Sequence, residues 1–215
     1  MRPENIRAVS IRIKRYICFF MQYYLYEKPR GLDFTMRDTK LYQKSGGVYH
    51  GYSKTSEKHL RDIFARLSYE DARLLDVGCG KGVVLKEALK FPFQKVAGIE
   101  IQQELVQTAK RNFAIMGVEE RIECIHADAV DFEGYGDYNV FFFFNPFSEE
   151  VLQKAVDKIL SGRGRDKQEI TVIYHNPRFI TVFEKNAQIL EKEMFHDSLK
   201  DYDTCILKLA VGRKQ

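Results

Sequence analysis

The sequence predicts an α/β domain built on an open, doubly wound and mostly parallel sheet of seven strands, with an antiparallel edge strand at the C-terminus. Three observations support this prediction. Short apolar runs of strand length alternate with amphipathic helical patterns between residues 55 and 187. Residues 138–145 (YNVFFFFN) are apolar almost throughout, as in a parallel strand buried on both faces. The last two apolar runs have no helix between them, which indicates a terminal hairpin.

The individual elements follow from local patterns. A first helix is predicted over residues 55–68 by apolar side chains at helical spacing, namely Leu60, Ile63, Phe64 and Leu67. Further helices are predicted over residues 83–90, 105–116, 149–160 and 177–187, and strands over residues 73–77, 95–101, 121–127, 138–145, 169–176, 192–199 and 203–211. Gly117 suits a left-handed helix end, Ser148 a helix start, and Pro177 the first turn of the last helix.

Composition favours one reduced globular domain. With 45% apolar and 13% aromatic residues, the 215-residue chain has enough apolar side chains for a packed core. Its four cysteines are widely scattered and no signal-peptide pattern opens the chain, so we expect a cytoplasmic protein without a disulfide framework. Cys124 and His126 are near neighbours, but no second Cys/His pair stands at zinc-site spacing, so no metal is predicted.

The basic excess lies in an N-terminal arm, residues 1–44, which precedes a predicted domain over residues 45–215. The arm holds ten Lys/Arg and four Asp/Glu, whereas the whole chain has a net charge of +4. Its apolar and aromatic run over residues 11–26 is too short to span a bilayer. Three interpretations stay open for the arm: a segment packed on the domain, a helix lying peripherally at a membrane surface, and a surface that meets an acidic partner.

A glycine-rich turn with an acidic residue follows the first predicted strand. Residues 74–82 read LLDVGCGKG, in which Gly78 and Gly80 let backbone amides approach a ligand and Cys79 contributes its amide. A dinucleotide pyrophosphate normally occupies such a turn, but Asp76 would place a carboxylate close to it, and the spacing is GxGxG instead of GxGxxG. A ligand that lacks phosphates and carries an ammonium group suits Asp76 better.

Two further acidic residues end the next strands. Glu100 ends the second strand, where a carboxylate accepts hydrogen bonds from both hydroxyls of a ribose. Asp128 ends the third strand, where it can accept from an adenine amino group while the amide of Ala129 donates to the ring. An adenosine with an amino-acid tail and no phosphate is S-adenosylmethionine. Asp128 has a simpler alternative role as a cap for the segment that follows it.

Together, LLDVGCGKG, VAGIEI and HADA resemble the first three motifs of class I S-adenosylmethionine-dependent methyltransferases, in order, over roughly residues 70–130. The resemblance implies the class I methyltransferase fold, S-adenosylmethionine as cofactor and S-adenosylhomocysteine as product. It also places Ile101, the last residue of VAGIEI, beside the nucleoside.

A narrower resemblance lies on either side of these motifs. YSKTS (52–56) is similar to the cofactor-binding loop of the disruptor-of-telomeric-silencing class of non-SET lysine methyltransferases, with Tyr52 and Thr55 at the matching positions. That class carries Asn-Asn-Phe where this chain has Asn145, Pro146 and Phe147. The proline moves the motif towards the Asn-Pro-Pro-aromatic signature of enzymes that methylate amino groups of nucleobases or glutamine. Thr55 as a helix cap and Asn-Pro as a turn are the simpler alternatives.

The resemblance therefore predicts methyl transfer to nitrogen, with Asn145 and the Pro146 carbonyl orienting the acceptor and Phe147 forming a wall. A protein or peptide amine similar to lysine is the first prediction for the acceptor. A nucleic acid base or small molecule is the alternative, and a non-catalytic adaptor that binds S-adenosylmethionine is a third. The sequence does not distinguish the number of methyl groups transferred or the oligomeric state.

Overall fold

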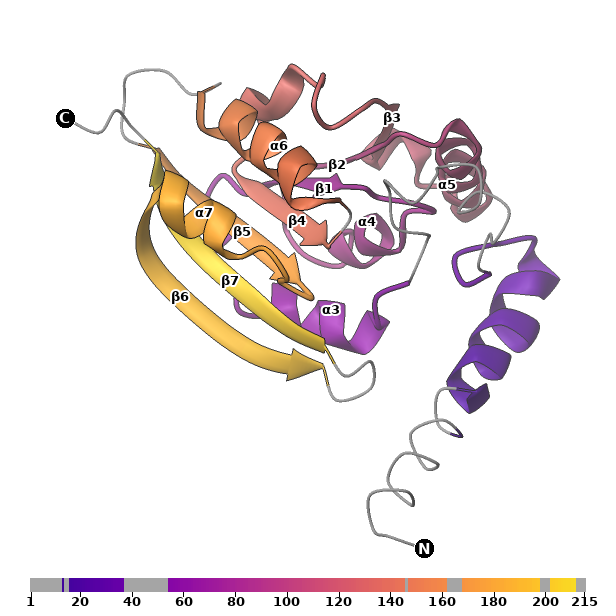
Figure 1. Cartoon of the computed structure of the whole chain (residues 1–215). Helices are drawn as coiled ribbons and strands as arrows, with labels where there is room; N and C mark the ends of the chain where they lie inside the picture. The colour runs from indigo at the N-terminus through magenta and orange to yellow at the C-terminus, as the bar shows by residue number, and fades with distance from the viewer. Residues whose placement is uncertain are drawn as a thin grey trace, which may run out of the picture.

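A seven-stranded sheet forms the centre of the protein (Figure 1). The computed structural model describes residues 13, 16–36, 54–145, 147–161, 168–197 and 202–211. The strands are β1 (Arg73–Val77), β2 (Lys95–Glu100), β3 (Glu123–His126), β4 (Val140–Phe144), β5 (Gln168–His175), β6 (Gln188–Asp197) and β7 (Tyr202–Val211). Their order in the sheet is β3-β2-β1-β4-β5-β7-β6.

The first five strands pair in parallel, and β7 is antiparallel to both of its neighbours, β5 and β6. The predicted fold class, an open and mostly parallel sheet with an antiparallel C-terminal strand, is confirmed. The structure adds the order within the terminal hairpin: β7 inserts next to β5, and β6 lies outside it.

Helices cover both faces of this sheet (Figure 1). They are α3 (Glu57–Phe64), α4 (Val83–Ala88), α5 (Gln103–Met116), α6 (Glu149–Ser161) and α7 (Thr181–Asn186), with short turns η3 (Glu119–Arg121) and η4 (Gly134–Asp137). Along β4, Phe141 and Phe143 point into the core under α6 and α7, whereas Phe142 points into the core under α3, α4 and α5. Because each face of the strand is covered, both side-chain rows are apolar, which explains the phenylalanine run.

Local signals set most helix ends as predicted, and two details are corrected. Gly117 takes the left-handed conformation (φ 64°) that ends α5. The side chain that caps α3 belongs to Ser56, which accepts from the His59 amide, so Thr55 is not the cap. Pro177 is not in the first turn of α7, because a left-handed Asn176 (φ 54°) and a turn over residues 178–180 come before that helix.

The described part of the N-terminal arm has two parts. Residues 16–20 form helical turns that continue through η1 (Met21–Glu27) and η2 (Lys28–Arg30), and this helix projects from the domain in Figure 1. After it, Leu32 and Phe34 are buried in the core beneath α5, where the Phe34 ring lies 6.1 Å from that of Phe113. The packed interpretation therefore holds for these residues of the arm. Residues 37–53 lie outside the described ranges, so the predicted boundary at residue 44 stays a prediction.

Candidate active site

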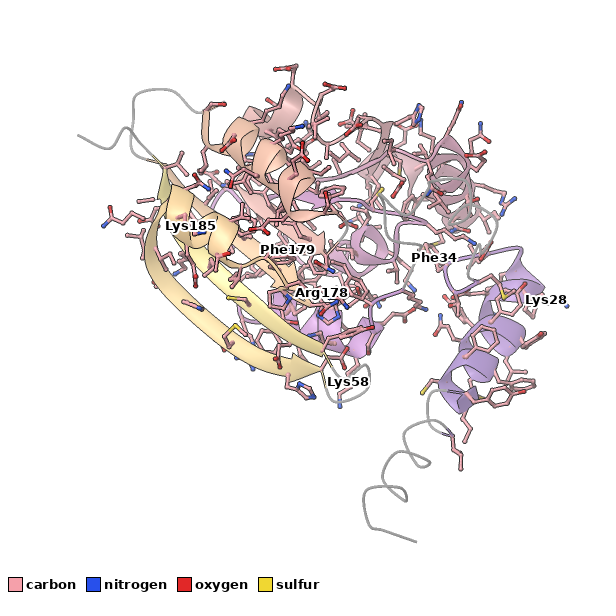
Figure 2. All side chains as sticks on the ribbon, in the orientation of Figure 1. Lys28, Phe34, Lys58, Arg178, Phe179 and Lys185 are labelled. Atoms are coloured by element: carbon pink, nitrogen blue, oxygen red, sulfur yellow. The ribbon has the colours of Figure 1, made fainter. Side chains whose placement is uncertain are left out.

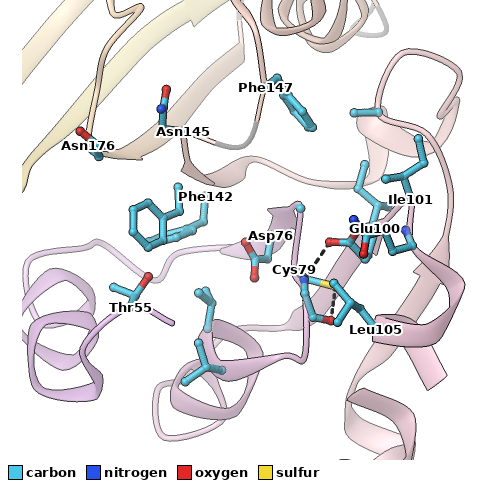
Figure 3. Close-up of a pocket in the computed structure, with 18 of the residues that line it drawn as sticks. Thr55, Asp76, Cys79, Glu100, Ile101, Leu105, Phe142, Asn145, Phe147 and Asn176 are labelled. Atoms are coloured by element: carbon cyan, nitrogen blue, oxygen red, sulfur yellow. Dashed lines mark hydrogen bonds between the residues drawn. The ribbon is translucent and has the colours of Figure 1, made fainter. Parts of the chain in front are cut away.

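A cavity of about 230 Å³ opens at the carboxyl ends of β1, β2 and β4 (Figure 3). Its wall contains eleven of the residues predicted for the site: Thr55, Asp76, Gly78, Cys79, Gly80, Glu100, Ile101, Asp128, Ala129, Asn145 and Phe147. The other two predicted residues, Tyr52 and Pro146, lie outside the described residues. Parallel strands bring these positions together because their carboxyl ends meet at one edge of the sheet.

Hydrogen bonds to β2 hold the glycine turn in place. The amides of Gly78 and Cys79 both donate to the Ile99 carbonyl at 2.9 Å, and the Gly80 amide donates to Oε2 of Glu100 at 3.0 Å. Gly78 has a φ of 90°, a backbone conformation that would be strained in any residue with a side chain. The Cys79 amide, which we expected to face the ligand, thus contacts the protein, while the residue itself lines the cavity.

Two buried carboxyl groups dominate the electrostatics of the cavity. Asp76 and Glu100 are only 3% and 9% exposed. Burial raises the pKa of Asp76 well above its ordinary value, and the nearby Glu100 raises it further. Burial also raises the pKa of Glu100, although the amides of Gln102 and Gly80 donate to that carboxylate. A cationic ligand in the cavity would offset this desolvation, whereas a phosphate would add to the negative charge.

Asp128, the third predicted acidic residue, both caps a turn and lines the cavity. Oδ1 of Asp128 accepts a hydrogen bond from the Val130 amide at 3.0 Å, so the residue does cap the turn after β3. It lines the cavity as well, beside Ala129, whose carbonyl accepts from the Tyr135 hydroxyl at 2.7 Å. This buried phenol fixes the backbone at the place where the adenine-binding amide was predicted.

Asn145 stands across the cavity from the glycine turn (Figure 3). It is 5% exposed and left-handed (φ 37°), and the Tyr174 hydroxyl donates to its Oδ1 at 3.1 Å. Burial raises the pKa of Tyr174 to about 12, so this phenol keeps its proton at neutral pH and remains a donor. The bond sets the direction of the Asn145 amide, and Phe147 adds a buried aromatic wall nearby.

Several cavity residues were not predicted. Phe142 and Phe144 belong to the phenylalanine run, which we assigned to the core alone. Asn176 and Arg178 follow β5, so the rule that ligands gather at carboxyl ends of strands would have found them. Tyr202 starts β7, and no local signal shows that an antiparallel strand delivers its first residue to this edge.

Metal ligands do not gather in the part of the chain that the structure describes. Across those ranges, no group of three or more His, Cys, Asp or Glu side chains is placed to hold a metal ion.

Part of this chain is similar in sequence to known methyltransferases. Residues 74–162 match the family described as "Methyltransferase domain". The rRNA N(6)-adenosine-methyltransferase metl-5 of Caenorhabditis elegans is 29% identical over 84 residues, 39% of this chain and 39% of that protein. The ribosomal protein L11 methyltransferase of Shewanella halifaxensis is 33% identical over 57 residues, 26% of this chain and 20% of that protein.

Solved structures match over a larger part of the chain. An RNA methyltransferase from Salinibacter ruber, in complex with S-adenosyl-L-homocysteine, superposes with a TM-score of 0.55 at 17% identity, covering 76% of this chain and 96% of that one. At this identity the match shows the shared fold. The chain spans about two fifths or less of the two curated relatives named above.

Proposed function

Because residues 74–162 match a methyltransferase domain, we propose that the protein transfers a methyl group from S-adenosylmethionine to a nitrogen acceptor and releases S-adenosylhomocysteine. The observation that supports this most is the pair of buried acids, Asp76 and Glu100, which line the cavity beside the glycine turn. Asp76 receives the ammonium group of the methionine part, and Glu100 receives the ribose hydroxyls. Asp128 and the Ala129 amide hold the adenine.

S-adenosylmethionine supplies an electrophilic methyl carbon bonded to a positively charged sulfur. The acceptor lone pair forms the new N–C bond while the C–S bond breaks and its electron pair stays on sulfur. One proton then leaves the nitrogen. The protein contributes alignment, which can supply part of the ~7–11 kcal/mol available from pre-organised geometry. Asn145, held by Tyr174, accepts a hydrogen bond from the acceptor NH and directs the lone pair, while Phe144 and Phe147 limit access of water.

A protein or peptide amine is the first acceptor class that we propose. Phe144, Phe147 and Tyr202 give the cavity aromatic walls, which accommodate the alkyl stem of lysine and bind its ammonium through ring faces. Desolvation in the cavity opposes the charged form of the amine and lowers its pKa, which produces the neutral form that attacks. Thr55 in the cavity wall is compatible with the lysine-methyltransferase resemblance, which otherwise stays a prediction.

A nucleic acid base is a second candidate, favoured by one residue. Arg178 lines the same cavity, and among the described residues its guanidinium forms no ion pair. A cation there repels a charged lysine and attracts a phosphate. An amino group of a base is already neutral, so it needs no apolar channel to lose a proton before transfer.

One labelling experiment distinguishes these classes. The purified protein and an Asp76→Asn variant are incubated with methyl-labelled S-adenosylmethionine and a cell extract, and the product is divided among protease-sensitive, nuclease-sensitive and low-mass fractions. Label that requires Asp76 and disappears with protease supports the protein acceptor. Nuclease-sensitive label supports the nucleic acid, and low-mass label identifies a small molecule. Bound S-adenosylhomocysteine without label in any fraction contradicts the enzymatic proposal and favours the adaptor.

The Arg178→Gln variant provides a further test of the nucleic acid acceptor. If the acceptor is a nucleic acid, the variant should weaken acceptor binding and lower the slope of log affinity against log salt by about one counterion. We expect cofactor affinity to stay unchanged, because we assign Arg178, which follows β5, to the acceptor side of the cavity. An unchanged salt dependence with a nuclease-sensitive product would remove Arg178 from the acceptor site.

A further inference from the structure

The helix of the N-terminal arm exposes an unusually apolar surface (Figure 2). Residues 16–26 (YICFFMQYYLY) contain no charged side chain. Seven large apolar side chains on its surface are between 43% and 70% exposed. These are Tyr16, Ile17, Phe20, Met21, Tyr24, Leu25 and Tyr26. Spacings of three and four residues place most of them along one broad side of the helix. A contiguous patch of this kind is a typical mark of an interaction surface.

The base of the helix is fixed to the domain, which gives the patch a defined position. Glu27 is fully buried and accepts hydrogen bonds from the amides of Phe34 (3.0 Å) and Thr35 (2.9 Å), and Lys54 pairs with it at 3.5 Å. Phe34 in turn packs in the core beneath α5. The helix is therefore tied to the domain at Glu27, while its apolar surface points into solvent.

Basic residues on both sides of the helix indicate which kind of partner binds its apolar surface. The first fifteen residues of the chain contain five Lys/Arg and one Glu. At the other end of the helix, Nζ of Lys28 lies 5.4 Å from the centre of the Tyr24 ring, and Cζ of Arg30 lies 4.4 Å from that of Tyr26. Tyrosine rings with adjoining cations suit the boundary between lipid headgroups and acyl chains, where the ring is buried and the charge meets lipid phosphate.

The length of the apolar segment determines whether the helix could span a bilayer or lie in its interface. Eleven uncharged helical residues reach about 16 Å, roughly half of the ~30 Å hydrocarbon core. In agreement, no helix among the described residues is long and apolar enough to cross a membrane. A helix of this length lies in the interface, with its apolar side towards the acyl chains.

We propose that residues 16–30 form an interfacial docking surface for an anionic lipid bilayer. Phe20, Tyr24 and Leu25 enter the boundary of the acyl chains, and the flanking cations contact lipid phosphate. Binding to an acidic partner would account for the cations of the arm, but it would not account for the large exposed apolar surface. This surface is separate from the candidate active site, so its function does not depend on methyl transfer.

Vesicle sedimentation with the full chain tests the proposal. One set of vesicles contains phosphatidylcholine only, and the other contains phosphatidylcholine with phosphatidylglycerol. The test variant carries Phe20→Ser, Tyr24→Ser and Leu25→Ser. The control variant carries Leu190→Ser and Met194→Ser, which remove two side chains of similar exposure (43% and 49%) from β6. Circular dichroism and S-adenosylhomocysteine affinity establish that each variant is folded.

We expect the wild type and the β6 control to sediment with the anionic vesicles and much less with phosphatidylcholine alone. The triple variant should lose at least about tenfold in partition coefficient, since burial of even one large apolar side chain is worth more than that factor. Equal partition onto both vesicle types overturns the assignment to anionic lipid. Wild-type protein that stays in the supernatant with both types also overturns it, and self-association abolished by the triple variant would then identify a second copy of the chain as the occupant.

Discussion

Asp33 of the N-terminal segment forms an ion pair with Lys81 of the glycine turn, with 2.6 Å between Oδ2 and Nζ. The Lys81 ammonium also donates to the Met36 carbonyl at 2.9 Å, and the Asp33 amide donates to Oδ1 of Asn112 at 2.9 Å. The arm and the candidate cofactor site are thus joined by polar contacts as well as by Phe34. Loss of the Asp33–Lys81 ion pair should therefore affect both the arm and the candidate cofactor site.

Asp33→Asn tests that connection. The substitution preserves the shape and removes the charge opposite a lysine side chain that is 5% exposed. We expect the free energy of unfolding to fall by about 1.5–3 kcal/mol, the usual value for a hydrogen bond to a charged group. Urea denaturation measures the change. Asp157→Asn, at an exposed position on α6, should change it by about 0.5 kcal/mol or less; equal effects would contradict a role for the pair.

Asp76→Asn should change the pH dependence of stability. Because burial raises the folded-state pKa of Asp76, its contribution to stability is fully present below the ordinary aspartate pKa of about 4 and is lost as pH rises through the raised value. The ligand-free variant should therefore match the wild type in acid and exceed it towards neutral pH. Urea midpoints over a pH series measure the difference, and parallel curves would disprove the assignment.

The same variant provides a second measurement at neutral pH. Although its ligand-free form is at least as stable as the wild type, it lacks the carboxylate proposed to bind the ammonium group. S-adenosylhomocysteine should raise the melting temperature of the wild type and have little effect on the variant. Equal ligand-induced shifts would exclude Asp76 from the cofactor site while leaving the pH argument intact.

Tyr174→Phe removes the hydroxyl that holds Asn145. We expect kcat/KM for the methyl acceptor to fall by about three- to tenfold, the equivalent of one hydrogen bond, with S-adenosylhomocysteine affinity unchanged. Tyr69→Phe is the matched control, because its hydroxyl donates to the Phe64 carbonyl at 2.6 Å and the residue does not line the cavity. That control should lower stability without lowering kcat/KM; a similar loss in both variants would indicate a general effect on the fold.

Gly82→Ala should be more destabilising than Gly117→Ala. Both glycines are left-handed, with φ of 87° and 64°. A Cβ at Gly82 would lie 2.6 Å from the Phe113 ring, whereas one at Gly117 meets no atom within 4 Å. We expect a loss of about 2–4 kcal/mol at Gly82, where strain and overlap add, and about 1–2 kcal/mol at Gly117, where strain acts alone. Thermal or urea unfolding ranks the two, and a reversed order would refute the close contact.

Most of the fold and the acidic edge of the cavity could be predicted because their causes are local. Periodicity of apolar residues defined the helices and strands, and the apolar run over residues 141–144 identified a central strand. Asp76, Glu100 and Asp128 lie at or within two residues of a strand end, so the rule for parallel sheets placed them at one edge without knowledge of any contact. The start of α7 was misplaced because Pro177 is compatible with a turn as well as with a helix.

Residue order alone therefore determined the class of sheet, its sequence of elements and the acidic edge of the cavity, since each depends on spacing along a few neighbouring residues. Tertiary structure decided how distant parts meet: the insertion of β7 beside β5, the hydroxyl of Tyr174 on Asn145, and the pair of Asp33 with Lys81. It also decided that the arm divides into a packed segment and an exposed helix. Such contacts join residues 29 to 48 positions apart, where only the packing of the whole chain selects one partner among many.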